Sequence, residues 1–491
     1  MKKQPNKYSE KLSSIKSLFH YLNDDRLHLG LSIFICIFFA AAYSILMVNK
    51  YLQLEYFSVD NVYFHSALWK LANLQTPMVY HRYLGQINIF GDHFHPIILI
   101  VGFFYRIFPW NQTIYVLMSA SYAIGGFFAF LISKKLLKNK WIIYPLLLAY
   151  FLYIGTQNAF LFGFHEINLL APVFFFTIWS LVEKKWKLYI LGFILVLLTK
   201  ESMAVIGIGI SIFAWFLGKE YRKVAIKSFV VSILWYLLVT KIIIPYFSGG
   251  QFLYGTIQLP NNLNSLTKSF IEPKEKIQTF IVSMFSFGFL PLLNIPALSL
   301  VLQDFIVRYV FAIPGNVQYL LTYHYGVALA PMMLLSSILS VSWMEKIKWG
   351  KYLILFFTLT TLFGTFYGNF KLSQRAPIFM VFNKGFYQTT QNNKFLWKLI
   401  EATPHDGSIM TQNHLGVPFS QYPVYPLSEN FKDLEKIKPD YLVYDLRDGQ
   451  NPNNFFPSTE ENWKEIIGEA IESAQYKEYF KDGSLYILKR Q

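Results

Sequence analysis

The chain has 491 residues, of which 54% are hydrophobic, 19% aromatic and only 15% charged. A soluble globular domain carries roughly 25% charged residues, so this composition excludes a soluble globular enzyme. The net charge of +15 comes from Lys and Arg in short clusters between apolar runs, which indicates a membrane protein with basic loops and argues against a nucleic-acid partner.

Apolar runs fill most of residues 31–369, and a helix needs roughly 20 such residues to cross a bilayer. The predicted membrane segments are 31–49, 113–132, 141–157, 167–182, 188–217, 224–245, 279–307, 324–343 and 351–368. Two of them, 188–217 and 279–307, are too long for one crossing. Lys200-Glu201 interrupts the first and Asn294-Ile295-Pro296 the second. We therefore expect a helical hairpin in each.

The basic clusters define the expected orientation, because loops rich in Lys and Arg stay in the cytoplasm. All of them fall on one side only if both long runs cross twice. They lie at 2–16, 134–140, 184–187, 219–227 and 346–351. The prediction is eleven crossings in the cell membrane, with residues 1–30 as a cytoplasmic basic tail and the C-terminus outside. Residues 50–112 and 246–278 are then external loops.

From residue 370 onward the composition is that of a water-soluble domain, which we expect to be extracytoplasmic. Its pattern predicts helices at 391–402 and 460–474, strands at 408–411 and 441–444, and a hairpin over 476–489 that turns at Asp482-Gly483. The expected architecture is an all-α polytopic membrane domain over 31–369 and a small C-terminal α/β domain over 370–491.

Ionisable residues are costly in a membrane, so function is expected where they gather at the external ends of the spans. Four clusters converge there on the predicted topology. They are Asp60; Asp92 with His93 and His95; His165 with Glu166; and Lys200 with Glu201.

Each cluster also has a purely structural interpretation. Asp60 suits the N-cap of a following helix, and the histidines suit interfacial hydrogen bonds to the backbone. His165 and Glu166 can form a solvated loop pair, and Lys200 with Glu201 an ion pair that closes a hairpin. The placement of all four clusters at one depth on one side favours a shared site.

The chemistry of these side chains allows proton transfer, metal binding and phosphate binding. Asp60, Asp92 and Glu166 are the candidate catalytic carboxylates, and Asp60 can accept a proton from an attacking hydroxyl or hold a divalent cation. The candidate ligands of such a metal ion are Asp60, Asp92, His93, His95 and His165. Lys200 and Arg82 are the candidate ligands of a phosphate at the membrane face, as in a polyprenyl phosphate.

Six stretches resemble a known family of multi-spanning bacterial and archaeal proteins, the domain of unknown function 2079, which is related to the GT-C glycosyltransferase superfamily. They are 57–69, 91–96, 164–166, 198–201, 323–325 and the external stretch from 404–408 through 441–445. They cover most of the chain in the order of the family. The resemblance adds Glu201, Tyr323 and His324 to the candidate site.

The resemblance implies an inverting transferase fold with a lipid-linked sugar as donor. In such a fold the first external loop forms two helices on the membrane surface, here 61–73 and 96–108. Asp60 would be the base or a metal ligand, and Lys200 would bind the donor phosphate. One departure is that Asn61 follows Asp60 and His65-Ser66 replaces a second acidic or amide residue, so a second carboxylate would have to be Asp92.

The sequence thus favours a GT-C-like glycosyltransferase that passes a sugar from a polyprenyl-phosphate donor to an extracytoplasmic acceptor. A polytopic transporter is the first alternative, and it would require polar residues near the middle of several spans. A non-catalytic envelope assembly or sensor protein, whose external domain binds a partner, is the second.

Overall fold

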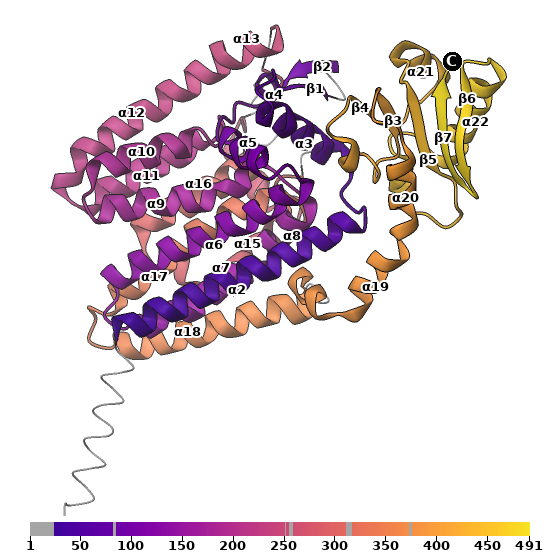
Figure 1. Ribbon diagram of the computed structural model, residues 1–491. Helices are drawn as coiled ribbons and strands as arrows, with labels where there is room; N and C mark the ends of the chain where they lie inside the picture. Colours follow the sequence, from indigo (N-terminus) through magenta and orange to yellow (C-terminus); the bar gives the residue numbers. More distant parts are fainter. Residues whose placement is uncertain (1–23, 82–84, 251, 255–258, 311–316, 373–375) are drawn as a thin grey trace, which may run out of the picture.

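The computed structural model describes residues 24–81, 85–250, 252–254, 259–310, 317–372 and 376–491. Most of the predicted cytoplasmic tail and Arg82 lie outside these residues. The described chain forms a bundle of helices with a small sheet region beside one end of it (Figure 1).

Five helical segments are long and apolar enough to cross a membrane in the described part of the chain, or six if one bent pair counts as a span. They comprise α2 (Asp25–Leu52), α6 (Asn111–Leu136), α12 (Arg222–Leu238) with η4 (Val239–Ile243) and α13 (Ile244–Ser248), η6 (His324–Ala328) with α17 (Leu329–Met344), and α18 (Gly350–Tyr367) with η7 (Gly368–Leu372). The bent pair is η1 (Lys140–Ile142) and α7 (Ile143–Phe151) with α8 (Ile154–Phe162), at 40°. A multi-pass membrane fold is confirmed, and the count of eleven crossings stays a prediction.

The first predicted hairpin is broken at Lys200-Glu201, whereas the second is broken from Phe287 onward, earlier than predicted, and Asn294 is the N-cap of its second long helix. The first run divides into α10 (Trp186–Leu197) and α11 (Met203–Leu217). The second divides into α15 (Glu275–Ser286), η5 (Leu290–Leu293) and α16 (Ile295–Tyr309). Lys276 Nζ donates to Tyr309 O at 3.1 Å, and the rings of Phe280 and Phe305 lie 5.1 Å apart, so α15 and α16 run antiparallel. Arms of this length reach about 18 to 23 Å, less than the full apolar thickness.

The basic clusters that the structure describes are gathered at one end of the bundle, to the left in Figure 1. Ion pairs and hydrogen bonds tie the helix ends together there. They join Lys134 and Lys140 to Asp25, Lys135 to Glu183, Lys184 to Glu220, and the backbone N–H groups of Lys138 and Asn139 to Glu345. The basic clusters can lie at the same end of the bundle only if each of the two long apolar runs crosses it twice.

The first predicted external loop folds over the other end of the bundle. It consists of α3 (Ser58–Ala72), an antiparallel hairpin of β1 (Met78–His81) and β2 (Gly85–Asn88), α4 (Ile89–Asp92) and α5 (Ile98–Ile107). The predicted helices 61–73 and 96–108 are found as α3 and α5. Arg106 Nη1 on α5 donates to Ala72 O at the end of α3 at 2.7 Å. The two helices therefore lie against each other above the bundle.

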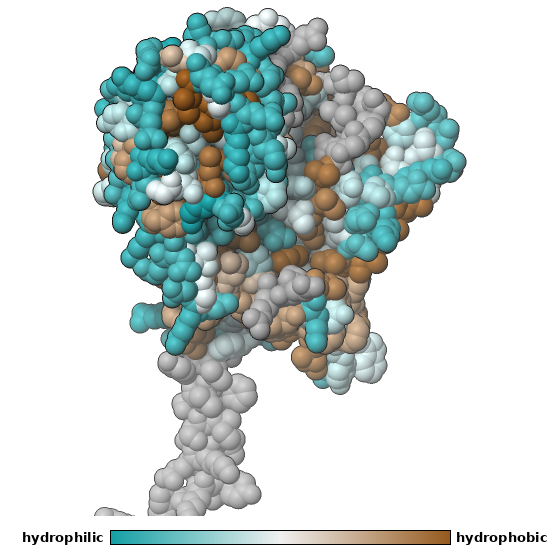
Figure 2. Space-filling view, turned by 90° about the vertical axis from the view of Figure 1, so that its right-hand side faces the viewer, coloured by the Kyte–Doolittle hydropathy of each residue, from teal (hydrophilic) through white to brown (hydrophobic). Residues whose placement is uncertain are grey.

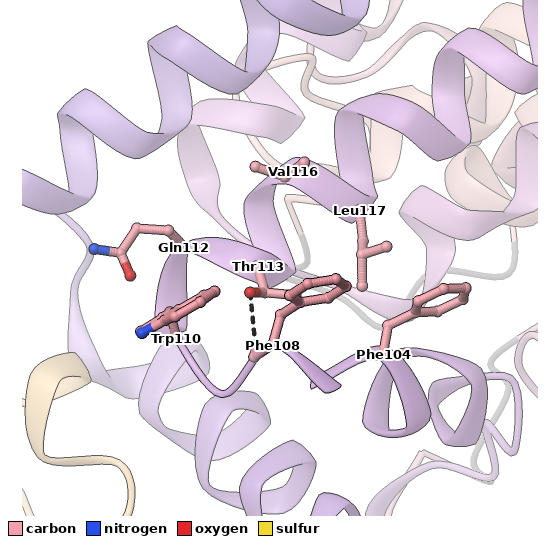
Figure 3. Close-up of a pocket in the computed structure, with 7 residues that line it drawn as sticks. All are labelled: Phe104, Phe108, Trp110, Gln112, Thr113, Val116 and Leu117. Carbon is pink, nitrogen blue, oxygen red and sulfur yellow. Dashed lines mark hydrogen bonds between the residues drawn. The ribbon is translucent and has the colours of Figure 1, made fainter. Parts of the chain in front are cut away.

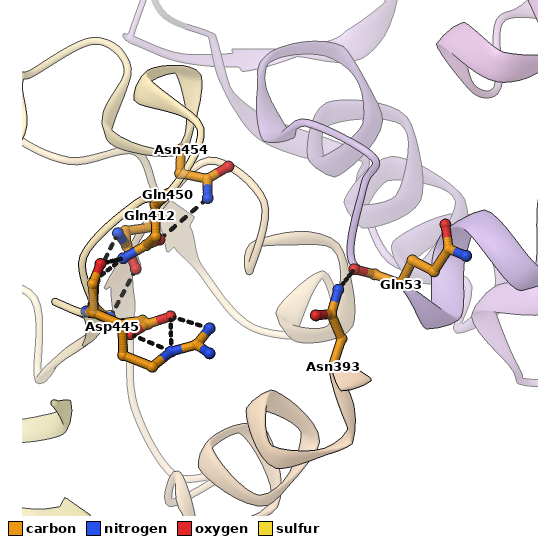
Figure 4. A network of polar contacts seen from close by, with 7 residues as sticks. Gln53, Asn393, Gln412, Asp445, Gln450 and Asn454 are labelled. Carbon is orange, nitrogen blue, oxygen red and sulfur yellow. Dashed lines mark hydrogen bonds and ion pairs between the residues drawn. The ribbon is translucent and has the colours of Figure 1, made fainter. Parts of the chain in front are cut away.

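The remaining helical elements either belong to the bundle or connect it to the sheet region. They are η2 (Glu166–Leu169), α9 (Leu170–Val182), η3 (Lys219–Tyr221), α14 (Leu263–Ile271), η8 (Pro377–Phe382), α19 (Lys384–Asn392) and α20 (Lys394–Ala402). Trp397 Nε1 on α20 donates to Leu52 O at 2.9 Å, and Asn393 Nδ2 donates to Gln53 O at 3.0 Å (Figure 4). The chain that leads to the sheet region is thus held against the end of α2.

The C-terminal region is a five-stranded mixed sheet with two larger helices. Its elements are β3 (Ile409–Thr411), η9 (Val417–Phe419), β4 (Val424–Tyr425), α21 (Phe431–Ile437), β5 (Tyr441–Asp445), η10 (Pro452–Phe455), α22 (Glu460–Glu472), β6 (Tyr476–Asp482) and β7 (Leu485–Arg490). The strand order is β4-β3-β5-β7-β6, with β4, β3 and β5 parallel. Trp463 of α22 packs against Tyr444 in its core. The predicted strands, helices and final hairpin are confirmed, whereas β4 and α21 were not predicted.

The two regions present different surfaces. Figure 2 looks onto the end of the molecule that carries the C-terminal region, and its rounded upper left part is mostly hydrophilic. Hydrophobic side chains gather beneath it and to its right. A water-exposed sheet region beside a lipid-facing bundle is the arrangement that the change of composition after residue 370 predicts.

Candidate functional site

The structure places the four predicted clusters on four neighbouring turns at the end of the bundle opposite the basic clusters. Asp60 lies in the first turn of α3, and Asp92 ends α4. Glu166 begins η2, and Lys200 and Glu201 occupy the break between α10 and α11. Gly163 lets α3 approach the turn that carries His165, because a Cβ there would lie 1.8 Å from Asn61 Oδ1 and its φ is +118°.

Lys200 pairs with Glu166 and not with its neighbour Glu201. Its Nζ lies 2.8 Å from Glu166 Oε1, and the exposed fractions of the two side chains are 16% and 1%. Burial alone would lower the pKa of Lys200, but the carboxylates of Glu166 and Glu201 outweigh it and raise that pKa above its usual range. The ammonium is therefore held in its charged form although most of the side chain is buried.

Glu201 is held by the turn that contains His93. Its Oε1 lies 2.9 Å from His93 Nδ1, and its Oε2 accepts from the backbone N–H of Phe94 at 3.1 Å. Burial and Lys200 would lower the pKa of His93, but Glu201 and Asp92 outweigh them and raise it. Burial would raise the pKa of Glu201, yet His93 and Lys200 lower it. Both shifts favour a charged imidazolium–carboxylate pair.

Asp92 faces an aromatic and imidazole wall. Tyr63 OH on α3 donates to Asp92 Oδ2 at 3.3 Å, and His81 Nε2 on β1 lies 3.9 Å from Asp92 Oδ1. The ring of Tyr254 stacks on His93 with centroids 4.5 Å apart. Burial and the charge of Asp92 both raise the pKa of Tyr254. Asp92 thus accepts a hydrogen bond on Oδ2, while its buried Oδ1 has no hydrogen-bond partner among the described residues.

Asp60 is the most exposed carboxylate of the group, with 42% of its side chain accessible. Its Oδ2 lies 3.9 Å from Nε2 of His165, which is buried and whose ring stacks on His324 with centroids 3.7 Å apart. Burial lowers the pKa of His165, so the imidazole beside Asp60 is favoured in its neutral form. Asp60 lies inside the helix and not at its N-cap, which is Phe57.

These contacts form one continuous line from Asp60 to Asp92. His165 touches Asp60 while its neighbour Glu166 holds Lys200, and Glu201, next to Lys200, holds His93, which follows Asp92. Residues from four separate segments are therefore brought together as the sequence predicted. The His165–Glu166 pair is buried, so its interpretation as a solvated loop pair is wrong.

Two further candidates lie at the margin of this group. His95 is completely buried between the rings of Phe64 and Phe90, at 5.6 and 5.9 Å, and its ring nitrogens have no hydrogen-bond partner among the described residues. Tyr323 packs edge-on against Phe162 at 5.4 Å. Among the described residues, no hydrogen bond or ion pair is recorded between either of them and the group that runs from Asp60 to Asp92.

The divalent metal site predicted from Asp60, Asp92, His93, His95 and His165 stays a prediction. No group of three or more His, Cys, Asp or Glu side chains in the described ranges is arranged to hold a metal ion. Of the five predicted ligands, His93 is held by Glu201 in its charged form, and aromatic rings surround His95.

Sequence reasoning missed Tyr63, His81 and Tyr254, which complete the wall around Asp92. Tyr63 lies within the predicted helix 61–73, but its hydrogen bond to Asp92 depends on how this helix packs against α4. His81 lies on a β-hairpin, and the alternation of residues in its two short strands was the only sequence pattern that could have predicted this hairpin. It also missed a second polar cluster on the hairpin α15–α16, where Arg308 Nη2 lies 2.5 Å from Asp304 Oδ2.

An apolar hollow lies between α5 and α6, apart from the charged residues. The rings of Phe104, Phe108 and Trp110 lie around it (Figure 3). Its volume is about 620 Å³. Thr113 Oγ1 at its edge donates to Phe108 O at 2.8 Å, so this hydroxyl is satisfied within the chain. Its lining suits hydrocarbon and contains none of the candidate site residues.

Comparison with known proteins gives a family and a fold. The family described as "Predicted membrane protein (DUF2079)" matches residues 50–480. No curated protein matches the chain. Among solved structures, the crystal structure of ArnT from Cupriavidus metallidurans bound to undecaprenyl phosphate is similar with a TM-score of 0.51 at 10% identity, over 92% of this chain and 97% of that one. At this identity the likeness shows that the two chains share an overall fold.

Proposed function

The chain belongs to the family of predicted membrane proteins that carries the domain of unknown function 2079, and from this membership and its ArnT-like fold we propose that it is a membrane glycosyltransferase. It transfers a sugar from a polyprenyl-phosphate donor to an extracytoplasmic acceptor in the cell envelope. The structure of ArnT holds undecaprenyl phosphate, a lipid of the class proposed for the donor.

One observation carries the proposal. An accessible carboxylate, Asp60, lies 3.9 Å from His165, and a largely buried charged ammonium, Lys200, pairs with the next residue, Glu166. A base for an incoming hydroxyl and a positive charge for a departing phosphate are the two groups that such a transfer needs near each other. The gathering of these charges at one end of the bundle favours a transferase over a transporter.

In the proposed reaction the acceptor hydroxyl oxygen attacks the anomeric carbon of the donor sugar. Asp60 takes the hydroxyl proton as the new carbon–oxygen bond forms. The bond between the anomeric carbon and the phosphate oxygen breaks, and the electron pair leaves with the polyprenyl phosphate. Lys200 stabilises the negative charge on that phosphate, and Glu166 keeps Lys200 in place.

The membrane arrangement proposed with this function has the N-terminus in the cytoplasm and the C-terminus outside, with eleven crossings. Residues 1–30 form the cytoplasmic tail, 31–369 the membrane domain and 370–491 the extracytoplasmic domain. Helices α3 and α5 lie on the external membrane surface. The outward face of α5 supports this placement, because Leu99, Phe103 and Ile107 are exposed on it.

The test is an assay of purified protein with radiolabelled polyprenyl-phosphate sugars and cell-envelope acceptors. Asp60→Asn should lower the rate by at least about a hundredfold while the protein still folds, which is the usual size of a general-base contribution. Asp482→Asn is the matched control, since Asp482 is exposed at the turn of the final hairpin. Equal turnover by Asp60→Asn and wild type would remove Asp60 from the mechanism.

A further inference from the structure

The helix that carries Asp60 has no cap of its own at its first turn. Phe57 occupies the N-cap position of α3 and its side chain makes no capping hydrogen bond. The first backbone N–H groups of a helix need partners from outside it. Here the backbone N–H of Ser58 donates to both Asn413 O and Asn413 Oδ1 at 2.7 Å, and Ser58 Oγ donates to Asn413 O at 2.6 Å.

We propose that Asn413 and Gly416 of the C-terminal region are positioning residues for Asp60. Asn413 caps the N-terminus of α3, and Gly416 forms the surface against which the first turn of α3 packs. Their meaning for catalysis rests on the proposed transferase function, but the positioning itself is a property of the fold.

Asn413 is itself held rigidly. Its backbone N–H donates to Asn454 O at 2.8 Å and its Nδ2 donates to Asn453 O at 3.0 Å. The segment from Asp445 to Asn454 is fixed in turn by an amide network (Figure 4). Gln412 and Gln450 each donate through Nε2 to Asp445 O, and Asn454 Nδ2 donates to Gln450 Oε1. Both oxygens of Asn413 therefore point at Ser58 from a fixed frame.

Gly416 shows how closely the two parts fit. A Cβ at this position would lie 2.2 Å from Ser58 Oγ and 2.8 Å from Val62 Cγ2. Its φ is −70°, which any residue adopts, so a larger residue here is disfavoured by the space that Ser58 and Val62 leave and not by backbone conformation. Ser58 and Val62 lie on either side of Asp60 in the sequence. The first turn of α3 is therefore seated directly on the C-terminal region.

A second contact fixes the middle of α3. Asn111 at the start of α6 donates through Nδ2 to Val417 O at 3.2 Å, and its Oδ1 lies 3.3 Å from Nδ1 of His65 on α3. Tyr80 of the first loop also meets Tyr425 of β4, with ring centroids 5.2 Å apart. The C-terminal region thus reaches the loop at three separate places.

The experiment compares Gly416→Ala and Asn413→Ala with Gly468→Ala, measured by hydrogen exchange on the full-length protein in detergent. Gly468 lies within α22 in open space, so the same substitution there leaves α3 untouched. We expect exchange of the backbone amides of residues 58–64 to rise by about tenfold or more in the first two variants and not in the third. Asn413→Asp keeps the side-chain oxygen that accepts from Ser58 but loses the N–H that donates to Asn453 O, so it should restore only part of the protection that Asn413→Ala loses.

Transfer assays on the same variants supply the second measurement. We expect kcat to fall by about tenfold in Gly416→Ala with the KM for the donor unchanged, since a displaced base slows chemistry without removing donor contacts. Unchanged exchange in both Gly416→Ala and Asn413→Ala would overturn the proposal. Raised exchange in a protein whose wild type transfers no sugar would leave the positioning standing and overturn the proposed function instead.

Discussion

Lys200 and Glu166 meet at 2.8 Å between Nζ and Oε1, in a place where both side chains are almost out of contact with water. The pair ties the break between α10 and α11 to the start of η2. Removing one partner of a buried ion pair leaves an uncompensated charge, which is costly, whereas removing both is not. Comparing a single with a double substitution of the pair therefore distinguishes a structural role of Lys200 from a role in the reaction.

We expect Lys200→Met to lower the free energy of unfolding by about 3 kcal/mol, because the Glu166 carboxylate then stays buried without its partner. The double variant Glu166→Gln/Lys200→Met should recover most of that loss. Its transfer activity should stay low, since the phosphate has lost its ammonium. Thermal unfolding in detergent and the transfer assay measure the two effects. Recovery of both stability and activity in the double variant would make Lys200 a structural residue only.

The burial of His95 predicts a loss of stability in acid. Burial lowers the pKa of His95 from 6.5 to about 4, so the folded protein resists protonation that the unfolded chain accepts. The stability that this contributes is complete above the unfolded pKa and is lost as the pH falls from about 6.5 to about 4, by roughly 3 kcal/mol. His95→Leu should therefore lose less stability than wild type over that range. Parallel unfolding curves for the two proteins would contradict this.

The close approach of Gly155 and Gly326 predicts a second sensitive position. A Cβ on Gly326 would lie 2.9 Å from Gly155 Cα, which is backbone and cannot turn aside. Gly326→Ala should push η6 away from α8, with a loss of about 1 to 3 kcal/mol, and move His324 from its stack on His165. Gly368→Ala is the control, because its Cβ would meet only Ser286 Oγ at 3.8 Å. Equal melting temperatures for both variants would show that the backbone at Gly155 and Gly326 can move apart without loss of stability.

The orientation in the membrane can be tested with single cysteines, since Cys36 is the only natural one and is buried. Asp482→Cys should react with a membrane-impermeant maleimide on intact cells. Lys185→Cys, at the basic end, should react only after the membrane is opened. Wild-type protein is the control, because any labelling of it must come from Cys36. The reverse pattern would place the C-terminal region in the cytoplasm.

The sequence predicted the breaks in the long apolar runs because charged or helix-starting residues stand out there. Lys200-Glu201 falls between α10 and α11, and Asn294 caps α16 by accepting from the backbone N–H of Ala297 at 3.1 Å. Strands β3 and β5 and the final hairpin were predictable for the same local reason. Strand β4 has two residues and α21 has seven, which is too short for a clear periodicity.

The partners within the site were not predictable from spacing. Adjacency suggested Lys200 with Glu201, but the tertiary fold pairs Lys200 with Glu166 and Glu201 with His93. Likewise, nothing local to Phe57 or Ser58 indicates that Asn413 completes their helix. Pairings of this kind depend on how distant segments pack, and a single sequence carries no record of that.

The capping of Ser58 by Asn413 spans 355 residues and sets an order for biosynthesis. Segment 58–72 leaves the ribosome early, yet the groups that hold its first turn are among the last quarter of the chain to be made. Long-range contacts of this kind form late. A nascent or truncated chain that lacks Asn413 therefore holds Asp60 on an unanchored turn, and this turn takes its final form only after the C-terminal region has been made.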